Sequence, residues 1–168
     1  MVRFGGADSW FGIGVDVSGS TAIVGSHGAA YLFEEQGPNW TQTAELTSSG
    51  GCFGERVAIC GSRAVIADPY EGVDQGAVYV FKNADTGWQE DDKLLPEAPL
   101  DWCSYDYFGW GVAISGPVAL VGARTLGDYG KAYVYEDSGT TWQQTARLTS
   151  DPLPDWFSDG VAISGSTV

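Results

Sequence analysis

The sequence has 168 residues and a mass of 17.8 kDa, a size that suits one buried core and not several independent domains. Asp and Glu number 22 against eight Lys and Arg, and the resulting net charge of −14 disfavours nucleic acid as a partner, because a phosphate-backbone binder needs a basic footprint. Glycine contributes 24 residues and 43% of the chain is hydrophobic, which indicates a turn-rich folded protein and not a disordered one.

A repeat organises the chain from end to end. Four segments that share an initial Phe and a terminal Gly align without gaps, namely FGIGVDVSG (11–19), FGERVAICG (53–61), FGWGVAISG (108–116) and FSDGVAISG (157–165). Each of the first three is followed by the same series of short apolar and aromatic runs. The period has to be identified before any single element, because it decides the fold class.

Each complete copy predicts four short strands, which we letter a to d. They are rich in Val, Ile, Tyr, Phe and Trp and are separated by turn signals such as Ser-Gly-Ser. Strand a lies in the Phe-Gly segment, and the others are expected at 21–25, 29–33 and 40–46, at 63–67, 77–81 and 88–94, and at 118–122, 131–135 and 142–148. In the third copy, Val112 and Ile114 should point to one side and Ala113 and Ser115 to the other, as expected when a second sheet packs on the small side.

Four antiparallel strands in each copy of about 40 to 55 residues are typical of a propeller blade. We therefore predict an all-β protein, a β-propeller of four-stranded antiparallel blades with three full blades and a part blade at each end. A β-sandwich of repeated hairpins is the alternative. The expected units are the tail of a preceding blade (1–10), blade 1 (11–52), blade 2 (53–107), blade 3 (108–156) and the start of a fourth blade (157–168).

Three complete blades are too few to close a ring. We therefore expect the remaining blades of a longer chain to complete the propeller, with self-association of this chain as the alternative. In either case the apolar faces at the two ends need a partner.

These residues resemble the FG-GAP repeat proteins. The resemblance is carried by the Ser-Gly turns, by Tyr31, Tyr79 and Tyr133 with the Trp that follows each, and by the pairs Phe11-Gly12, Phe53-Gly54 and Phe108-Gly109. It implies a β-propeller related to the head of integrin α subunits, and a role in adhesion or ligand binding outside the cell or at its surface. The calcium loops of the integrin-like relatives are not matched, because the a–b turns VSGST, ICGSR and ISGPV are short and poor in carboxylates.

Loop lengths distinguish the two ends of the predicted blades. Because strands alternate in direction, the a–b and c–d turns share one rim, while the b–c and d–a connections share the other. The c–d turn has a constant length, whereas the b–c connection grows from Ser26-His27 in the first copy to 68–75 in the second. We call the second rim the variable rim, and we expect it to bind the ligand because insertions collect where binding occurs.

The variable rim combines carboxylates with aromatic rings, which suits a cation, a basic protein patch or a carbohydrate that stacks on rings. We expect a protein or carbohydrate ligand and no nucleic acid. The alternative is that the acids only keep the surface soluble. The predicted ligand-binding residues are Asp68, Tyr70, Glu71, Asp74, Trp102, Tyr105, Asp106, Asp128 and Tyr129.

No cofactor is expected, although three carboxylates of this rim lie on one loop. Asp68, Glu71 and Asp74 could together hold calcium, but their spacing is not that of an EF-hand. Asp16 stands where the other copies have Ala, so it is either a local hydrogen-bonded cap or a ligand contact.

The sequence shows no catalytic motif, so we expect no enzymatic activity. The single histidine, His27, has no Ser or Cys motif around it and is interpreted as a turn residue. The segment from Asp137 to Trp142 resembles the Asp-box of sialidases, a fold-stabilising turn and not a catalytic group. The alternative function is a propeller enzyme or lectin, a carbohydrate-active protein whose active residues lie in missing blades.

The cysteines and one sequon complete the sequence signals. Cys60 takes a place held by Ser in the other copies, which predicts a small buried side chain. Cys52 and Cys103 lie in connections, and their disulfide state stays open. Asn39-Trp40-Thr41 is a glycosylation sequon, which has meaning if the chain is secreted.

Overall fold

The computed structural model describes residues 10–48, 51–96, 106–124, 130–149 and 160–165. The strands in chain order are β1 (Val15–Ser18), β2 (Thr21–Ser26), β3 (Ala29–Gln36), β4 (Asn39–Thr47), β5 (Arg56–Cys60), β6 (Arg63–Asp68), β7 (Ala77–Ala84), β8 (Gly87–Leu94), β9 (Phe108–Ser115), β10 (Val118–Ala123), β11 (Lys131–Asp137) and β12 (Trp142–Thr149). A short helical turn, α1 (Glu71–Asp74), lies between β6 and β7. Within these ranges, no helix is long and apolar enough to cross a membrane.

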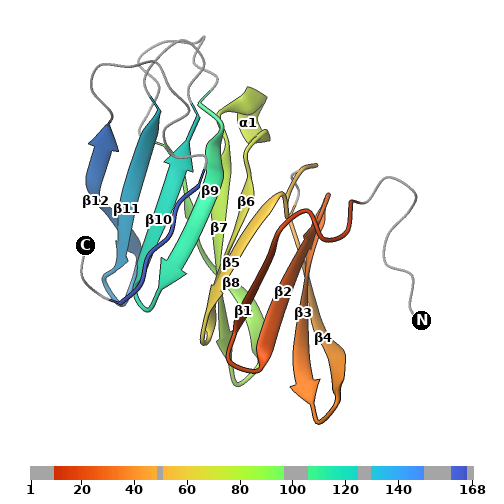
Figure 1. Cartoon of the computed structure of the whole chain (residues 1–168). Helices are drawn as coiled ribbons and strands as arrows, with labels where there is room; N and C mark the ends of the chain where they lie inside the picture. Colours follow the sequence, from red (N-terminus) through yellow and green to blue (C-terminus); the bar gives the residue numbers. More distant parts are fainter. Residues whose placement is uncertain (1–9, 49–50, 97–105, 125–129, 150–159, 166–168) are drawn as a thin grey trace.

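The strands form three four-stranded antiparallel sheets, one for each complete copy of the repeat (Figure 1). Each sheet keeps the chain order, so that every strand pairs with its neighbour in sequence. We call them sheet 1 (β1–β4), sheet 2 (β5–β8) and sheet 3 (β9–β12). The all-β prediction with four antiparallel strands in each copy is confirmed, whereas ring closure and the part blades stay predictions.

The register repeats as well as the strand order. In all three sheets the pairing between the third and fourth strands shifts at the same place, after Leu32, Val80 and Val134. A β-bulge of this kind bends the strand and increases its twist. The three sheets therefore have the same shape, as their stacking requires.

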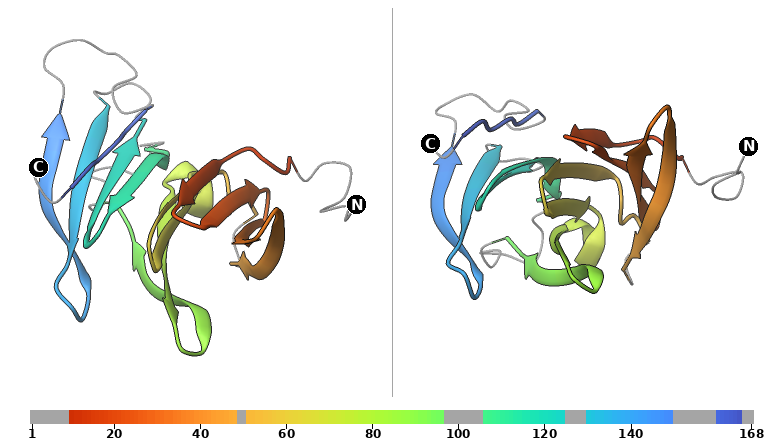
Figure 2. Two further views of the ribbon diagram at one scale, coloured as in Figure 1. Left: turned by 60° about the horizontal axis from the view of Figure 1, so that its bottom comes forward. Right: turned by 90° about the horizontal axis from the view of Figure 1, so that it is seen from below.

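The sheets lie side by side in chain order, with sheet 2 between the other two (Figure 2). β5 contacts β1 and β2, and β9 contacts β5 and β6, so the first strand of each sheet packs on the sheet before it. The front face of a sheet is the one turned toward the preceding sheet, and the back face is turned toward the next. The copies do not fold into the two facing layers of a sandwich.

Sheet 2 is buried on both faces, because successive side chains along its strands point to opposite faces. Ala64 and Ile66 of β6 belong to the cluster between sheets 1 and 2, while Val65 and Ala67 belong to the cluster between sheets 2 and 3. All four side chains are fully buried. Full burial of an aliphatic side chain contributes about 1.5 to 3 kcal/mol relative to exposure, so these two clusters hold the sheets together.

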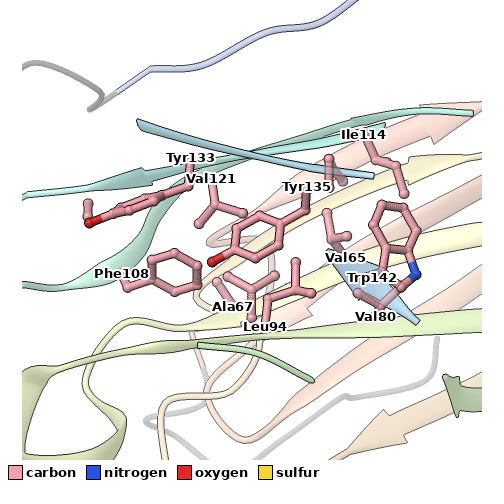
Figure 3. Close-up of a cluster of buried hydrophobic side chains, with 14 residues drawn as sticks. Val65, Ala67, Val80, Leu94, Phe108, Ile114, Val121, Tyr133, Tyr135 and Trp142 are labelled. Atoms are coloured by element: carbon pink, nitrogen blue, oxygen red, sulfur yellow. The ribbon is translucent and has the colours of Figure 1, made fainter. Parts of the chain in front are cut away.

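Figure 3 shows the cluster between sheets 2 and 3, in which Phe108, Tyr133 and Tyr135 pack over Val65 and Ala67. Ile114 and Val112 contact the same cluster. The predicted alternation along β9 is confirmed for these two residues.

The Phe-Gly pair connects each sheet to the one before it. Phe53 is fully buried and packs edge-on against Tyr79 and Phe81 of its own sheet, with ring centroids 5.3 and 6.0 Å apart. Gly54 has a φ of +97°, and a Cβ there would lie 2.2 Å from the carbonyl oxygen of Ser26. Only glycine allows this approach to the b–c turn of sheet 1.

Polar contacts on the first strands also join the sheets. Asp16 accepts hydrogen bonds from the N–H groups of Val17 and Ile59, each at 2.8 Å, so it caps its own strand and reaches sheet 2. Cys60 is partly buried, and its sulfur accepts from the N–H of Gly116 at 3.3 Å. The structure shows Asp16 as a hydrogen-bonded cap, the first of the two alternatives predicted for this residue.

Candidate ligand-binding site at the variable rim

The b–c connections and the starts of the first strands lie at one end of the sheets. In Figure 1, α1 stands at this end beside the start of β9. The antiparallel order puts the a–b and c–d turns at the other end. Asn39 lies in a c–d turn and is exposed, so the sequon is at the end opposite to the variable rim.

Asp68 lies beneath the rim surface. Only 1% of the residue is exposed, and its two carboxylate oxygens accept hydrogen bonds from the N–H groups of Tyr70 at 3.1 Å and Cys52 at 3.2 Å. Burial raises the pKa of Asp68, and these two N–H groups oppose that rise. Asp68 therefore fixes the b–c connection to the d–a connection from inside the protein.

Two other predicted carboxylates, Glu71 and Asp106, differ in their surroundings. Glu71 accepts a hydrogen bond from the Tyr79 hydroxyl at 2.6 Å and pairs with the Lys93 ammonium. Asp106 is 7% exposed, and its Oδ1 has no hydrogen-bond partner within the described residues. The predicted residues Trp102, Tyr105, Asp128 and Tyr129 lie outside the described residues.

The carboxylates of residues 68–74 do not converge on one point, because Asp68 points inward and Glu71 is paired with Lys93. Across the described ranges, no three His, Cys, Asp or Glu side chains are arranged to hold a metal ion. Cys52 has no disulfide partner within the described residues, and Cys103 lies outside them. Burial raises the pKa of the Cys52 thiol, and the nearby carboxylates add to the rise, which keeps the sulfur protonated and a poor nucleophile.

The b–c connection of sheet 2 contains strained backbone. Gly72, Val73 and Asp74 have successive φ values of +66°, +65° and +64°, in the left-handed region. A left-handed conformation costs an ordinary L-residue about 1 to 2 kcal/mol, and Val73 is β-branched. Strain of this kind persists where the surrounding structure imposes it, and it concentrates at functional sites.

The contacts that impose this conformation come from the start of sheet 3. The carbonyl groups of Asp74 and Gln75 accept hydrogen bonds from the N–H groups of Tyr107 and Phe108, both at 3.0 Å. Gly76 lies so close that a Cβ there would be 2.1 Å from the carbonyl oxygen of Phe108. Tyr107 itself has a φ of +43°. The loop of sheet 2 is thus fixed onto sheet 3.

Three aromatic rings meet where the loop joins β9. Tyr70, Tyr107 and Trp110 contact one another edge-on, with ring centroids 5.7, 5.8 and 6.2 Å apart. The guanidinium carbons of Arg56 and Arg124 lie 5.4 and 5.0 Å from the centroid of Trp110. Two of the eight Lys and Arg residues of this acidic chain therefore make cation-π contacts with one ring.

The cluster extends across sheet 2 to sheet 1. Glu55 is 7% exposed, and its two carboxylate oxygens contact Arg56 Nη1 at 3.2 Å and His27 Nε2 at 2.9 Å. The His27 ring stacks on Trp10, with centroids 5.3 Å apart and an interplanar angle of 9°. We define the rim cluster as Trp10, His27, Glu55, Arg56, Tyr70, Tyr107, Trp110 and Arg124.

Most of this cluster was not predicted as ligand-binding from the sequence. His27 was interpreted as a turn residue, and in the structure it also pairs with Glu55. Arg56 stands where the other copies have glycine, and Trp110 aligns with Ile13 and Glu55. The signal that could have indicated the cluster is this variability directly after the Phe-Gly pair, in a segment that is otherwise uniform.

Residues 88–135 match the family model of the FG-GAP repeat, which confirms the sequence resemblance over that segment. Among solved structures, the chain is similar to Saccharomyces cerevisiae Sqt1, a WD40 propeller, with a TM-score of 0.59 and 14% identity over 85% of this chain. The match covers 36% of Sqt1, and at this identity it shows a likeness of fold alone. No curated protein matches the sequence.

Proposed function

We propose that this chain is a non-catalytic FG-GAP β-propeller segment that binds a ligand through the rim cluster. The observation that carries the proposal is the strained loop 72–74. Its conformation is imposed by contacts with sheet 3 and places Tyr70 against Tyr107 and Trp110. Tyr70 is exposed, Tyr107 and Trp110 are partly buried, and backbone strain that fixes the position of such rings is typical of a binding surface.

The exposed groups of the rim suit a protein or carbohydrate ligand. Trp10 is 65% exposed and Tyr70 is 39% exposed, so ring surface is open to solvent. An arginine guanidinium carries a permanent positive charge and a fork of N–H groups that matches a carboxylate or another oxyanion. Arg56, which also pairs with Glu55, and Arg124 place two positive charges beside the Trp110 ring, and this local charge favours a ligand that carries an anionic group.

Adhesion outside the cell or at its surface is part of the proposal, and it rests on the FG-GAP resemblance. The match over residues 88–135 and the propeller-like stacking support it. The open rings of the rim are compatible with recognition of a partner on a neighbouring surface.

A binding panel tests the proposal. Acidic and neutral glycans and peptides would be presented to the protein with and without calcium, and the double variant Arg56→Gln, Arg124→Gln would be compared with the wild type. We expect the variant to lose at least about tenfold in affinity for acidic members, a loss of about 1.4 kcal/mol.

The matched control is Lys82→Gln, which removes one positive charge from an exposed position of β7 outside the rim cluster. It should bind as the wild type does. Equal binding by the double variant and the wild type would contradict the site, and hydrolysis of a panel glycan would contradict the non-catalytic assignment.

A further inference from the structure

The front face of sheet 1 is an open apolar surface. Phe11 is 41% exposed, Val15 67%, Val17 60% and Trp40 46%. The residues at the same repeat positions in sheets 2 and 3 lie in the clusters between the sheets. In sheet 2 they are Phe53, Val57, Ile59 and Trp88, which face sheet 1, and in sheet 3 they are Phe108, Val112, Ile114 and Trp142, which face sheet 2. Sheet 1 therefore carries one half of an interface that the chain forms twice internally.

The back face of sheet 3 carries the other half. Leu148 is 42% exposed, whereas its counterparts Leu46 and Leu94, which the next sheet covers, are 5% and 2% exposed. Leu120 stands where Ile23 and Val65 stand in the other sheets. The two ends of the described structure thus have complementary residue patterns.

We propose that the front face of sheet 1 docks on the back face of sheet 3 in a second copy of this chain. The contact is a third instance of the interface that already joins sheets 1 and 2 and sheets 2 and 3. It is head to tail, so repetition leads either to closed rings or to open chains of molecules. The proposal is independent of the function assigned to the rim cluster.

A polar contact sets the register of this interface. Inside the chain, Ser18 Oγ accepts a hydrogen bond from the N–H of Gly61 at 3.0 Å, and Cys60 Sγ accepts from Gly116 at 3.3 Å. Ser115 holds the corresponding place in sheet 3, and Gly19 holds that of the turn glycine in sheet 1. In the docked pair, Ser115 of one copy accepts from Gly19 of the other.

Residues 160–165 compete for the same face. They align with the first strand of a copy, and they lie along sheet 3 on the side away from sheet 2 (Figures 1 and 2). A second copy has to displace them before its sheet 1 can dock. Deletion of residues 157–168 is therefore expected to strengthen the association.

Light scattering of the full chain as a function of concentration tests the proposal. We expect the mass to rise above 17.8 kDa, and to rise at lower concentration after the deletion. Val17→Asp places a charge in the interface and should keep the mass at 17.8 kDa. Val73→Asp makes the same chemical change at an exposed position on the rim and should associate as the wild type does.

Cross-linking tests which faces meet. The N–H of Ile59 in sheet 2 donates to Asp16 in sheet 1. In the docked pair, Val17 of one copy corresponds to Ile59, and Ala113 of the other copy corresponds to Asp16. Val17→Cys and Ala113→Cys proteins, mixed and mildly oxidised, should form a disulfide-linked dimer that neither protein forms alone. Val17→Cys mixed with Gly139→Cys, whose thiol lies in a c–d turn, should not. A wild-type mass of 17.8 kDa at every concentration, or equal cross-linking in both mixtures, would overturn the proposal.

Discussion

Single residues determine how closely the sheets approach. The phenylalanine of the Phe-Gly pair contacts aromatic rings of its own sheet inside the cluster between the sheets, and the glycine lies close to the preceding sheet. A Cβ at Gly54 would meet the carbonyl oxygens of Ser26 and Ala29, whereas a Cβ at Gly109 would meet the side chains of Ala67 and Val78. This close approach explains why the pair is repeated, since any side chain at the second position would separate the sheets.

Replacement of Gly54 by Ala should therefore be far more costly than replacement of a turn glycine. The new Cβ would meet two backbone oxygens at 2.2 and 2.3 Å, and φ is +97°. We expect Gly54→Ala to lower the free energy of unfolding by at least about 3 kcal/mol. Gly37→Ala, at φ +63° with open space around it, should lower it by about 1 to 2 kcal/mol. Urea denaturation measures both, and equal effects would contradict the packing role.

Asp137 makes stability depend on pH in the acid range. It accepts hydrogen bonds from the N–H of Gly139 at 2.7 Å and from Arg63 of sheet 2 at 2.5 Å. The Gly139 N–H, followed by Arg63, lowers the pKa of Asp137. The unfolded chain therefore binds this proton more readily than the folded one. The stabilisation is complete above the ordinary carboxyl pKa and is lost as the pH falls through the lowered pKa.

Unfolding free energies measured between pH 2 and 6 test this linkage. Asp137→Asn should be less stable than the wild type near pH 6, and the difference should shrink as the pH falls. A difference between Asp137→Asn and the wild type that stays constant with pH would contradict the account.

The loop between β6 and β7 keeps a strained backbone conformation that lowers the stability of the fold. Val73 is 83% exposed and left-handed, so its side chain adds strain without adding to the core. We expect Val73→Gly to raise the free energy of unfolding by up to about 1 kcal/mol, because glycine accepts this φ. The same change frees the loop and should weaken ligand binding at the rim.

The two measurements for Val73→Gly are urea denaturation and affinity for the best member of the binding panel. Gly28→Ala is a useful comparison, since it alters a left-handed position in the short b–c connection of sheet 1. A loss of stability in Val73→Gly would show that the loop is not strained, and unchanged binding would show that its shape does not matter for the ligand.

The strands were predictable because their signals are local and repeated three times. Val65 and Ile66 alternate between two clusters with the period of a strand, and the alignment of copies gave the same four strands each time. The rim cluster was not predictable in the same way. Arg56 and Trp110 are far apart in sequence, and they meet only because the stacking brings the starts of β5 and β9 together.

The loop residues show a second reason why the rim could not be predicted from the sequence. Val73 adopts a left-handed conformation that is unfavourable for a β-branched residue, so its identity gives no signal for this turn. Asp68 looked like a rim carboxylate because it begins a long connection, but it is also the last residue of β6 and remains in the interior. Contacts with neighbouring segments determine both the backbone conformation of Val73 and the burial of Asp68, and the loop sequence alone does not predict those contacts.

The whole molecule should be most stable in its middle. Sheet 2 has neighbours on both sides, whereas the front face of sheet 1 exposes Val15 and Val17. We expect the amides of β6 and β7 to exchange with deuterium most slowly and those of β1 to exchange fastest among the inner strands. Hydrogen exchange followed by mass spectrometry measures this gradient. Equal protection of the three sheets would contradict a serial arrangement.

The central claim is that the three sheets stack in chain order, front face on back face, which brings the variable connections to one rim. Methyl NOEs in an isotope-labelled protein test it most directly. The account predicts contacts from Ile23 to Ile59 or Ile66, contacts from Val65 to Ile114 or Val121, and none from Ile23 to Val121. Contacts between Ile23 and Val121, with those to Ile59 and Ile66 missing, would show that sheets 1 and 3 face each other and would contradict it.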